Sequence, residues 1–164
     1  MAERNSSINA DGIFEPFSTD EAPWEEFAHG QRFASRFKRL DKFGGGTHVG
    51  VCLEELEPGK QSGPAHYHML EEEHLYILEG SLTLRLGDKT FELSKEDYVC
   101  FPAGQKAGHT LINHSDTTCR YLIIGEKSPH EVTLYTDSGR IQVRLVQEGY
   151  DQSKTMEYWE GEDN

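Results

Sequence analysis

Positive charge is scarce in this sequence. Its 164 residues include 16 lysines and arginines against 29 aspartates and glutamates, so the formal net charge is −13. A field of this sign repels phosphate backbones and anionic lipid head groups. We therefore expect neither nucleic acid nor a membrane surface as a partner.

Long apolar runs and paired cysteines are also missing. No stretch approaches the roughly 18 apolar residues that a membrane-spanning helix needs, and the polar residues 1–7 predict no signal peptide. The three cysteines, Cys52, Cys100 and Cys119, form no CxxC pair. An odd number of unpaired cysteines is typical of a reducing compartment, so we expect a cytoplasmic protein. Cys100 and Cys119 lie in apolar segments, where we expect small core residues.

Short strands separated by turn signals fill the centre of the chain. Ser81–Leu86 alternates leucine with polar residues, Gly87-Asp88 makes a tight turn, and residues 89–93 return, which predicts a β-hairpin. Sustained helical periodicity is lacking, and a series of short strands with regular turns favours a closed antiparallel β-structure. Further strands are predicted over residues 32–40, 47–56, 74–78, 97–101, 109–113, 119–125, 131–135 and 140–146.

The chain length suits one domain with flanking segments. We expect an N-terminal arm over residues 1–30, a barrel over 31–147 and an acidic tail over 148–164. Two interpretations of residues 1–25 are open. Phe14, Phe17 and Trp24 can pack the arm onto the barrel, or the polar composition can leave it disordered.

Four side chains form a potential ligand set for a metal ion. His66 and His68 lie two residues apart, so both point to one face of a strand. Glu73 follows beyond a bend and can fold back towards them. His109 begins a separate strand, from which it can supply a fourth ligand from the opposite sheet. Three imidazoles and a carboxylate suit one divalent transition metal, whereas an isolated HxH is more often a surface strand.

The spacing of these residues resembles the two motifs of the cupins. In the first, Gly59 precedes His66 and His68, Glu73 follows after four residues, and Gly80 after six more. In the second, Pro102 and Gly104 precede His109, and Asn113 follows. The gaps from Gly59 to His66 and from Gly104 to His109 depart from the family pattern, and Glu96 replaces its first glycine. The resemblance covers about residues 45–126.

This resemblance implies a fold and a metal site. The expected fold is all-β, a double-stranded β-helix or jelly-roll barrel, with His66, His68, Glu73 and His109 as metal ligands. The distance to Gly80 favours Glu73 over Glu71 and Glu72, which we interpret as a solvated acidic turn. Alternation then points Leu75 and Ile77 inward with Glu73. One Zn, Fe, Mn or Ni ion per chain is expected, with the element left open.

The sequence leaves two functions open, because cupins include dioxygenases, isomerases, decarboxylases, lyases and non-catalytic binders. The first is a metalloenzyme, such as an oxygenase, isomerase or lyase, acting on a sugar derivative, keto acid or diol at an open coordination position. The alternative is a non-catalytic sensor that uses the metal to hold a small molecule, and a purely structural metal is a third, weaker option. No general acid or base is recognisable beside the four ligands. Outward apolar residues such as Tyr76 and Leu78 predict a homodimer.

Overall fold

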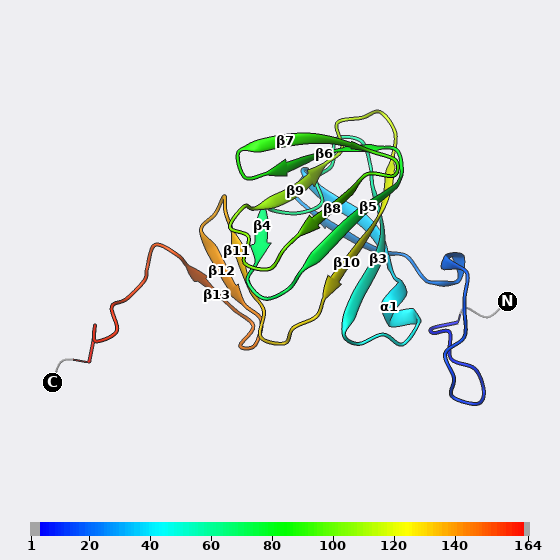
Figure 1. Cartoon of the computed structure of the whole chain (residues 1–164), viewed down its shortest axis with the longest axis horizontal. Coiled ribbons are helices and arrows are strands. Elements are labelled where there is room, and N and C mark those ends of the chain that lie inside the picture. The colour runs from blue at the N-terminus through cyan, green and yellow to red at the C-terminus, as the bar shows by residue number, and fades with distance from the viewer. Residues whose placement is uncertain (1–3, 163–164) are drawn as a thin grey trace.

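The strands of the chain form two antiparallel sheets that pack face to face (Figure 1). The computed structural model describes residues 4–162. One sheet has the order β1-β2-β3-β10-β5-β8 and the other β13-β12-β11-β4-β9-β6-β7. This architecture confirms the predicted all-β jelly-roll barrel with an N-terminal arm and a C-terminal tail.

The strands are short, and the helical elements are limited to one turn each. The strands of the first sheet are β1 (Glu25–His29), β2 (Phe33–Arg39), β3 (Val49–Leu56), β5 (Glu73–Glu79), β8 (Tyr98–Phe101) and β10 (Cys119–Glu126). Those of the second are β4 (His66–His68), β6 (Ser81–Leu86), β7 (Lys89–Ser94), β9 (His109–Ile112), β11 (Val132–Tyr135), β12 (Arg140–Val143) and β13 (Glu148–Asp151). The helical turns are η1 (Thr19–Glu21) and α1 (Leu40–Phe43).

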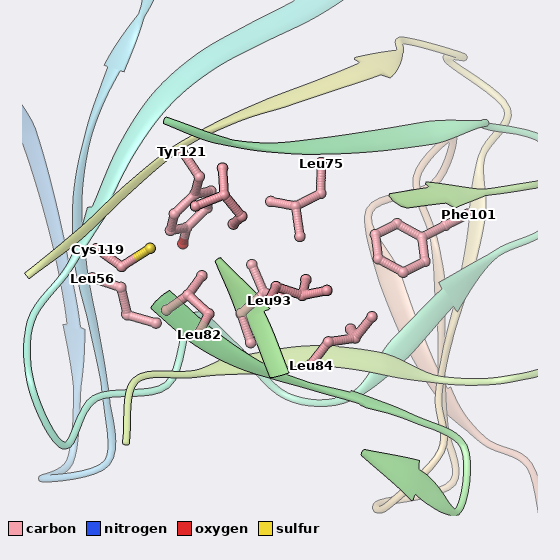
Figure 2. Packing of buried hydrophobic residues seen from close by; sticks show 10 residues of the cluster. Leu56, Leu75, Leu82, Leu84, Leu93, Phe101, Cys119 and Tyr121 are labelled. Atoms are coloured by element: carbon pink, nitrogen blue, oxygen red, sulfur yellow. The ribbon is translucent and has the colours of Figure 1, made fainter. Parts of the chain in front are cut away.

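The core lies between the two sheets. Leu75 and Ile77 of β5 are fully buried, which confirms the predicted inward face of that strand. Leu82 and Leu84 of β6 point towards them from the other sheet (Figure 2). Alternation thus places one apolar row of each strand inside the barrel and leaves the other row outside.

The predicted hairpin of β6 and β7 is present, with Ser81 paired to Ser94 and Leu86 to Lys89. The predicted central strands agree with the structure to within a few residues. The sequence patterns did not identify the terminal strands β1 and β13, and the strand predicted over 140–146 ends at Val143. Both missed strands are polar, and each lies at the edge of its sheet. They therefore lack the apolar alternation that marks a half-buried strand.

The N-terminal arm packs on the barrel, as one of the two interpretations of residues 1–25 expected. The rings of Phe17 and Phe43 lie 4.8 Å apart, and the Ser7 amide donates to the Phe43 carbonyl at 2.9 Å. The Arg36 guanidinium lies over Trp24, with its Cζ 4.6 Å from the centroid of the tryptophan ring. After β13, residues 152–162 extend away from the barrel (Figure 1).

One prediction about a single side chain was wrong. Cys100 is half-buried on the outer face of β8 rather than in the core, whereas Cys119 is fully buried as expected. Tyr98 is 58% exposed, although an aromatic in an apolar segment is more often buried. Both belong to an edge strand whose outer face lacks a covering layer. Among the helices of residues 4–162, none has the length and apolar character needed to cross a membrane.

Candidate metal centre

Three histidines lie side by side on the inner face of one sheet. β4 places His66 and His68 on the same side, and His66 is the direct cross-strand partner of His109 on β9. The ring centroids of His66 and His109 are 4.7 Å apart, and those of His66 and His68 are 5.1 Å apart. The prediction that His109 comes from the opposite sheet was therefore wrong, because β4 and β9 are neighbours.

The opposite sheet supplies the carboxylate. Glu73 is the first residue of β5, and its Oε2 lies 3.4 Å from His68 Nε2 and 3.3 Å from His109 Nε2. Ligand atoms of His66, His68 and Glu73 all lie within 4.8 Å of one another. The structure thus brings the four predicted side chains together, three from one sheet and one from the other.

The bend between β4 and β5 allows Glu73 to return to the histidines. Glu131 is fully buried, and its carboxylate accepts hydrogen bonds from the amides of Met69 at 2.8 Å and Leu70 at 3.1 Å. The Gly104 amide donates to the His68 carbonyl at 2.8 Å. Gly104 has a φ of 74°, which a glycine adopts without steric cost. This hydrogen bond attaches the loop of the second motif to the strand of the first.

The orientation of His66 leaves one ring nitrogen available. Its Nδ1 lies 2.8 Å from the Pro64 carbonyl oxygen, which can only accept, so Nδ1 carries the proton and donates. In the neutral ring Nε2 is then unprotonated, and its lone pair can bind a metal ion. Metal-binding histidines commonly have this arrangement, in which a carbonyl fixes the tautomer of the ligating ring.

Two buried carboxylates lie behind His68. Its Nδ1 is 3.5 Å from Glu71 Oε2 and 3.5 Å from Glu131 Oε1, while its Nε2 faces Glu73. A carboxylate behind a histidine is the usual outer partner of a metal ligand. The interpretation of Glu71 as solvated was wrong, because Glu71 is 4% exposed. It is paired with Arg144, whose Nη2 donates to Glu71 Oε2 at 2.9 Å.

An aromatic ring packs against His109, the fourth predicted ligand. Phe101, at the end of β8, stacks on His109 with ring centroids 3.9 Å apart and an interplanar angle of 13°. Phe101 and the side chain of His109 are both largely buried. Stacking fixes the ring plane of His109 while its Nε2 stays directed at Glu73.

The proton affinities of the cluster depend strongly on burial and on neighbouring charges. Burial, together with the adjacent His109, lowers the pKa of His66 to about 4, so His66 is neutral near pH 7. Burial also lowers the pKa of His68, but the hydrogen bond and charge of Glu73, with Glu131 and Glu71, outweigh this and raise it. Burial raises the pKa of Glu73, yet the hydrogen bonds from His109 and His68 bring it well below its usual range. Glu73 is therefore ionised, as a ligand must be.

The cluster opens into a pocket of about 200 Å³ at one end of the barrel. Its walls include Gly50, Cys52 and Ile123 of β3 and β10, and its rim carries Glu72 and Glu126. Burial, followed by the charges of Asp41 and Glu54, raises the pKa of the Cys52 thiol to about 11. Cys52 is therefore a neutral thiol in this wall at physiological pH.

Sequence reasoning missed Glu54, which lies in the inward row of β3 that includes Cys52 and Leu56. Its cross-strand partner is Tyr121, which is fully buried. Burial raises the pKa of Glu54 to about 7, against the lowering effect of the neighbouring Ser35 and Tyr121 hydroxyls, and the charge of Glu73 adds to the rise. The signal was available, because strand alternation from Cys52 places Glu54 inside.

Comparison with known proteins relates the barrel to a family. The family model described as a cupin domain matches residues 52–125. These residues of the barrel resemble a cupin domain. Tetracenomycin polyketide synthase protein TcmJ of Streptomyces glaucescens is 32% identical to the chain over 68 residues. That match covers 42% of the chain and 44% of TcmJ, so it spans less than half of the relative.

Two solved structures resemble this chain over most of its length. A sugar phosphate isomerase of the cupin superfamily from Silicibacter pomeroyi superposes with a TM-score of 0.77 at 25% identity, covering 89% of this chain and 98% of the other. An Acidithiobacillus ferrooxidans protein, provisionally described as a sugar phosphate isomerase, has a TM-score of 0.72 at 29% identity. It covers 76% of this chain and 80% of that one.

Proposed function

We propose that this chain is a cupin metalloenzyme acting on a small oxygenated metabolite, with His66, His68, Glu73 and His109 binding one divalent transition metal. The observation that supports the proposal is the orientation of the imidazoles. His66 donates from Nδ1 to a carbonyl, and the Nδ1 of His68 faces two carboxylates. Their Nε2 atoms are thus left for an ion next to Glu73, and the donor set suits Zn, Fe, Mn or Ni.

A bound divalent metal supplies a Lewis acid with one or two positions open to an oxygen donor. The chain's own residues set the protonation state of the ligands and shape the space beside them. Neutral His66 and ionised Glu73 need no proton removal before binding, whereas the raised pKa of His68 lets a proton compete with the metal at that ring. Ile123 and Gly50 leave room for a ligand beside the cluster, and the Cys52 thiol lines the same wall.

The pocket lining also favours a substrate of particular charge. Of the described residues that line it, none is lysine or arginine, while Glu72 and Glu126 lie at the rim. Carboxylates at a rim disfavour a phosphate dianion. The neighbours described as sugar phosphate isomerases support a sugar-like hydroxy-carbonyl substrate, and the acidic rim favours its unphosphorylated form over the phosphate ester.

The test combines metal analysis with a substrate panel. Wild type, His109→Ala and the control His48→Ala, which alters an exposed histidine, are loaded with each metal in turn, and metal content is measured by elemental analysis. Each is then incubated with aldoses, ketoses, their phosphates, keto acids and diols, and products are followed by NMR. We expect His109→Ala to lose one equivalent of metal and all turnover, while His48→Ala retains both.

Other results would contradict the proposal. Equal metal content in His109→Ala and wild type would refute the ligand set. Saturable binding without turnover by metal-loaded protein would support the non-catalytic sensor instead. Faster turnover of sugar phosphates than of the free sugars would refute the inference from the acidic rim.

We further propose that the chain is cytoplasmic and forms a homodimer. The dimer proposal rests on the outward apolar side chains of β5, where Tyr76 is 37% exposed and Leu78 is half-buried. Light scattering measures the assembly directly. A mass near 18.6 kDa, that of one chain, would contradict the dimer.

A further inference from the structure

The strand that supplies Glu73 also carries potential ligands on its outer face. His74 follows Glu73 and therefore points to the opposite side of the sheet. Its cross-strand partner on β8 is Cys100. Glu72 precedes the strand and turns to the same outer side, where its Oε1 lies 3.1 Å from His74 Nε2. Ligand atoms of these three residues all lie within 4.8 Å of one another.

Tyr98 orients His74 within this cluster. The Tyr98 hydroxyl oxygen lies 2.7 Å from His74 Nδ1, and the two rings stack at 22° with centroids 5.9 Å apart. Glu72 Oε1 can only accept, so in the absence of an ion His74 Nε2 donates to it and the Tyr98 hydroxyl donates to Nδ1. A hydroxyl oxygen can also accept, so when a cation replaces the Nε2 proton the imidazole proton moves to Nδ1 and is donated to Tyr98.

In a single chain the outer cluster is accessible to ions from solution. Glu72, His74 and Cys100 are each half-buried, and Tyr98 is exposed. Glu72 and His74 line a surface hollow that adjoins the inner pocket and shares Glu72 and Glu126 with it. The Glu72 amide donates to Glu126 Oε2 at 3.0 Å, so a further carboxylate stands at the edge of the hollow. No large movement is needed for an ion to reach all three side chains.

We propose that Glu72, His74 and Cys100 form a second metal site that binds a zinc-class divalent cation on the outer face of β5 and β8. One thiolate, one imidazole and one carboxylate suit Zn²⁺, Co²⁺ or Cd²⁺, whereas a thiolate ligand disfavours Mg²⁺ and Ca²⁺. Water completes a tetrahedral shell. On binding, the Cys100 thiol releases its proton to solvent and the sulfur electron pair goes to the metal.

The site is chemically distinct from the inner cluster, which has no sulfur among its four proposed ligands. This difference makes it measurable, because a thiolate bound to Co²⁺ gives a near-ultraviolet charge-transfer band. Cys52 is the one other thiol that needs a control, since it lines the inner pocket.

The experiment is a titration of the full-length, metal-free protein with CoCl₂ in the presence of a non-thiol reductant, followed by absorbance and by equilibrium dialysis. Wild type should bind two Co²⁺ per chain and develop the charge-transfer band. Cys100→Ser should bind one equivalent and lose the band, and His74→Asn should weaken the outer equivalent at least tenfold. Cys52→Ser and His109→Ala should both retain the band, and His109→Ala should lose only the inner equivalent.

The outcomes separate this site from the inner one. A band that survives in Cys100→Ser, or that disappears in Cys52→Ser, would overturn the proposal. So would a wild type whose total stoichiometry is unchanged by Cys100→Ser. Circular dichroism of each variant checks the fold, and the pair Cys100→Ser and His74→Asn keeps the test valid if one of them misfolds. If only the inner ligands fail to bind Co²⁺, the charge-transfer band that depends on Cys100 will still appear.

Discussion

Replacing Glu54 with glutamine should stabilise the metal-free protein above neutral pH. The carboxyl lies inside the barrel beside Tyr121, and burial raises its pKa from an ordinary 4.5 to about 7. Glutamine has nearly the same shape but carries no charge at any pH. The substitution therefore removes the cost of burying an ionised carboxylate and changes little else in the packing.

The sign and size of this stabilisation follow from the difference in proton binding between the folded and unfolded chains. Below pH 4.5 the carboxyl is protonated in both the folded and the unfolded chain, and its ionisation costs nothing. Between pH 4.5 and about 7 the folded chain keeps a proton that the unfolded chain loses, so the stability of the wild type falls as pH rises. At about 1.4 kcal/mol per pKa unit, the full loss is about 3 kcal/mol above pH 7.

The assay is urea denaturation in chelator at a series of pH values from acid to slightly alkaline, followed by tryptophan fluorescence. The free energy of unfolding of Glu54→Gln, minus that of wild type, should rise by about 3 kcal/mol from its low-pH value across this range. Glu57→Gln, at an exposed position of the next segment, is the control and should stay within about 0.5 kcal/mol of wild type. A Glu54→Gln difference that stays flat with pH would refute the burial of a titrating carboxyl.

Three further predictions concern the core and the metal centre. Leu75→Ala removes a fully buried side chain and should cost about 2–5 kcal/mol in urea denaturation; a cost below about 1 kcal/mol would contradict the packing described. Glu131→Gln weakens the partner of His68 and should lower metal affinity roughly 10–100-fold in competition with a chelator, and unchanged affinity would exclude that role. Because the pKa of His68 is raised, a proton competes with the metal there, so affinity should decline as pH falls; isothermal titration at several pH values tests this, and pH-independent affinity would argue against it.

Local patterns were sufficient to predict most of the barrel and the identity of the clustered side chains. The hairpin of β6 and β7 has strict alternation and a Gly-Asp turn, so its register follows from neighbouring residues alone. His66 and His68 share a face for the same reason. By contrast, β1 and β13 pair at sheet edges with polar residues outward, and their strand conformation comes from the neighbouring strand rather than from their own composition.

The errors at the site come from contacts between distant parts of the chain. Glu71 looks solvated in sequence, but its charge is met by Arg144, 73 residues away. His109 was assigned to the wrong sheet because residue order alone does not say which strands pair. Glu54 was overlooked although alternation placed it inside, because a glutamate in a strand is usually interpreted as an outward residue.

The alternation of β5 makes its two faces sensitive to the register of its pairing. Glu73 faces the barrel interior, while Glu72 and His74 face outward on either side of it. A one-residue slip in the pairing of β5 with β8 and β10 would turn the strand over and exchange these two donor sets, together with Leu75 and its neighbours. A slip of two residues would preserve the facing and move it by one pleat. The burial of Leu75 and Ile77 therefore also decides which donor set faces the pocket and which faces solvent.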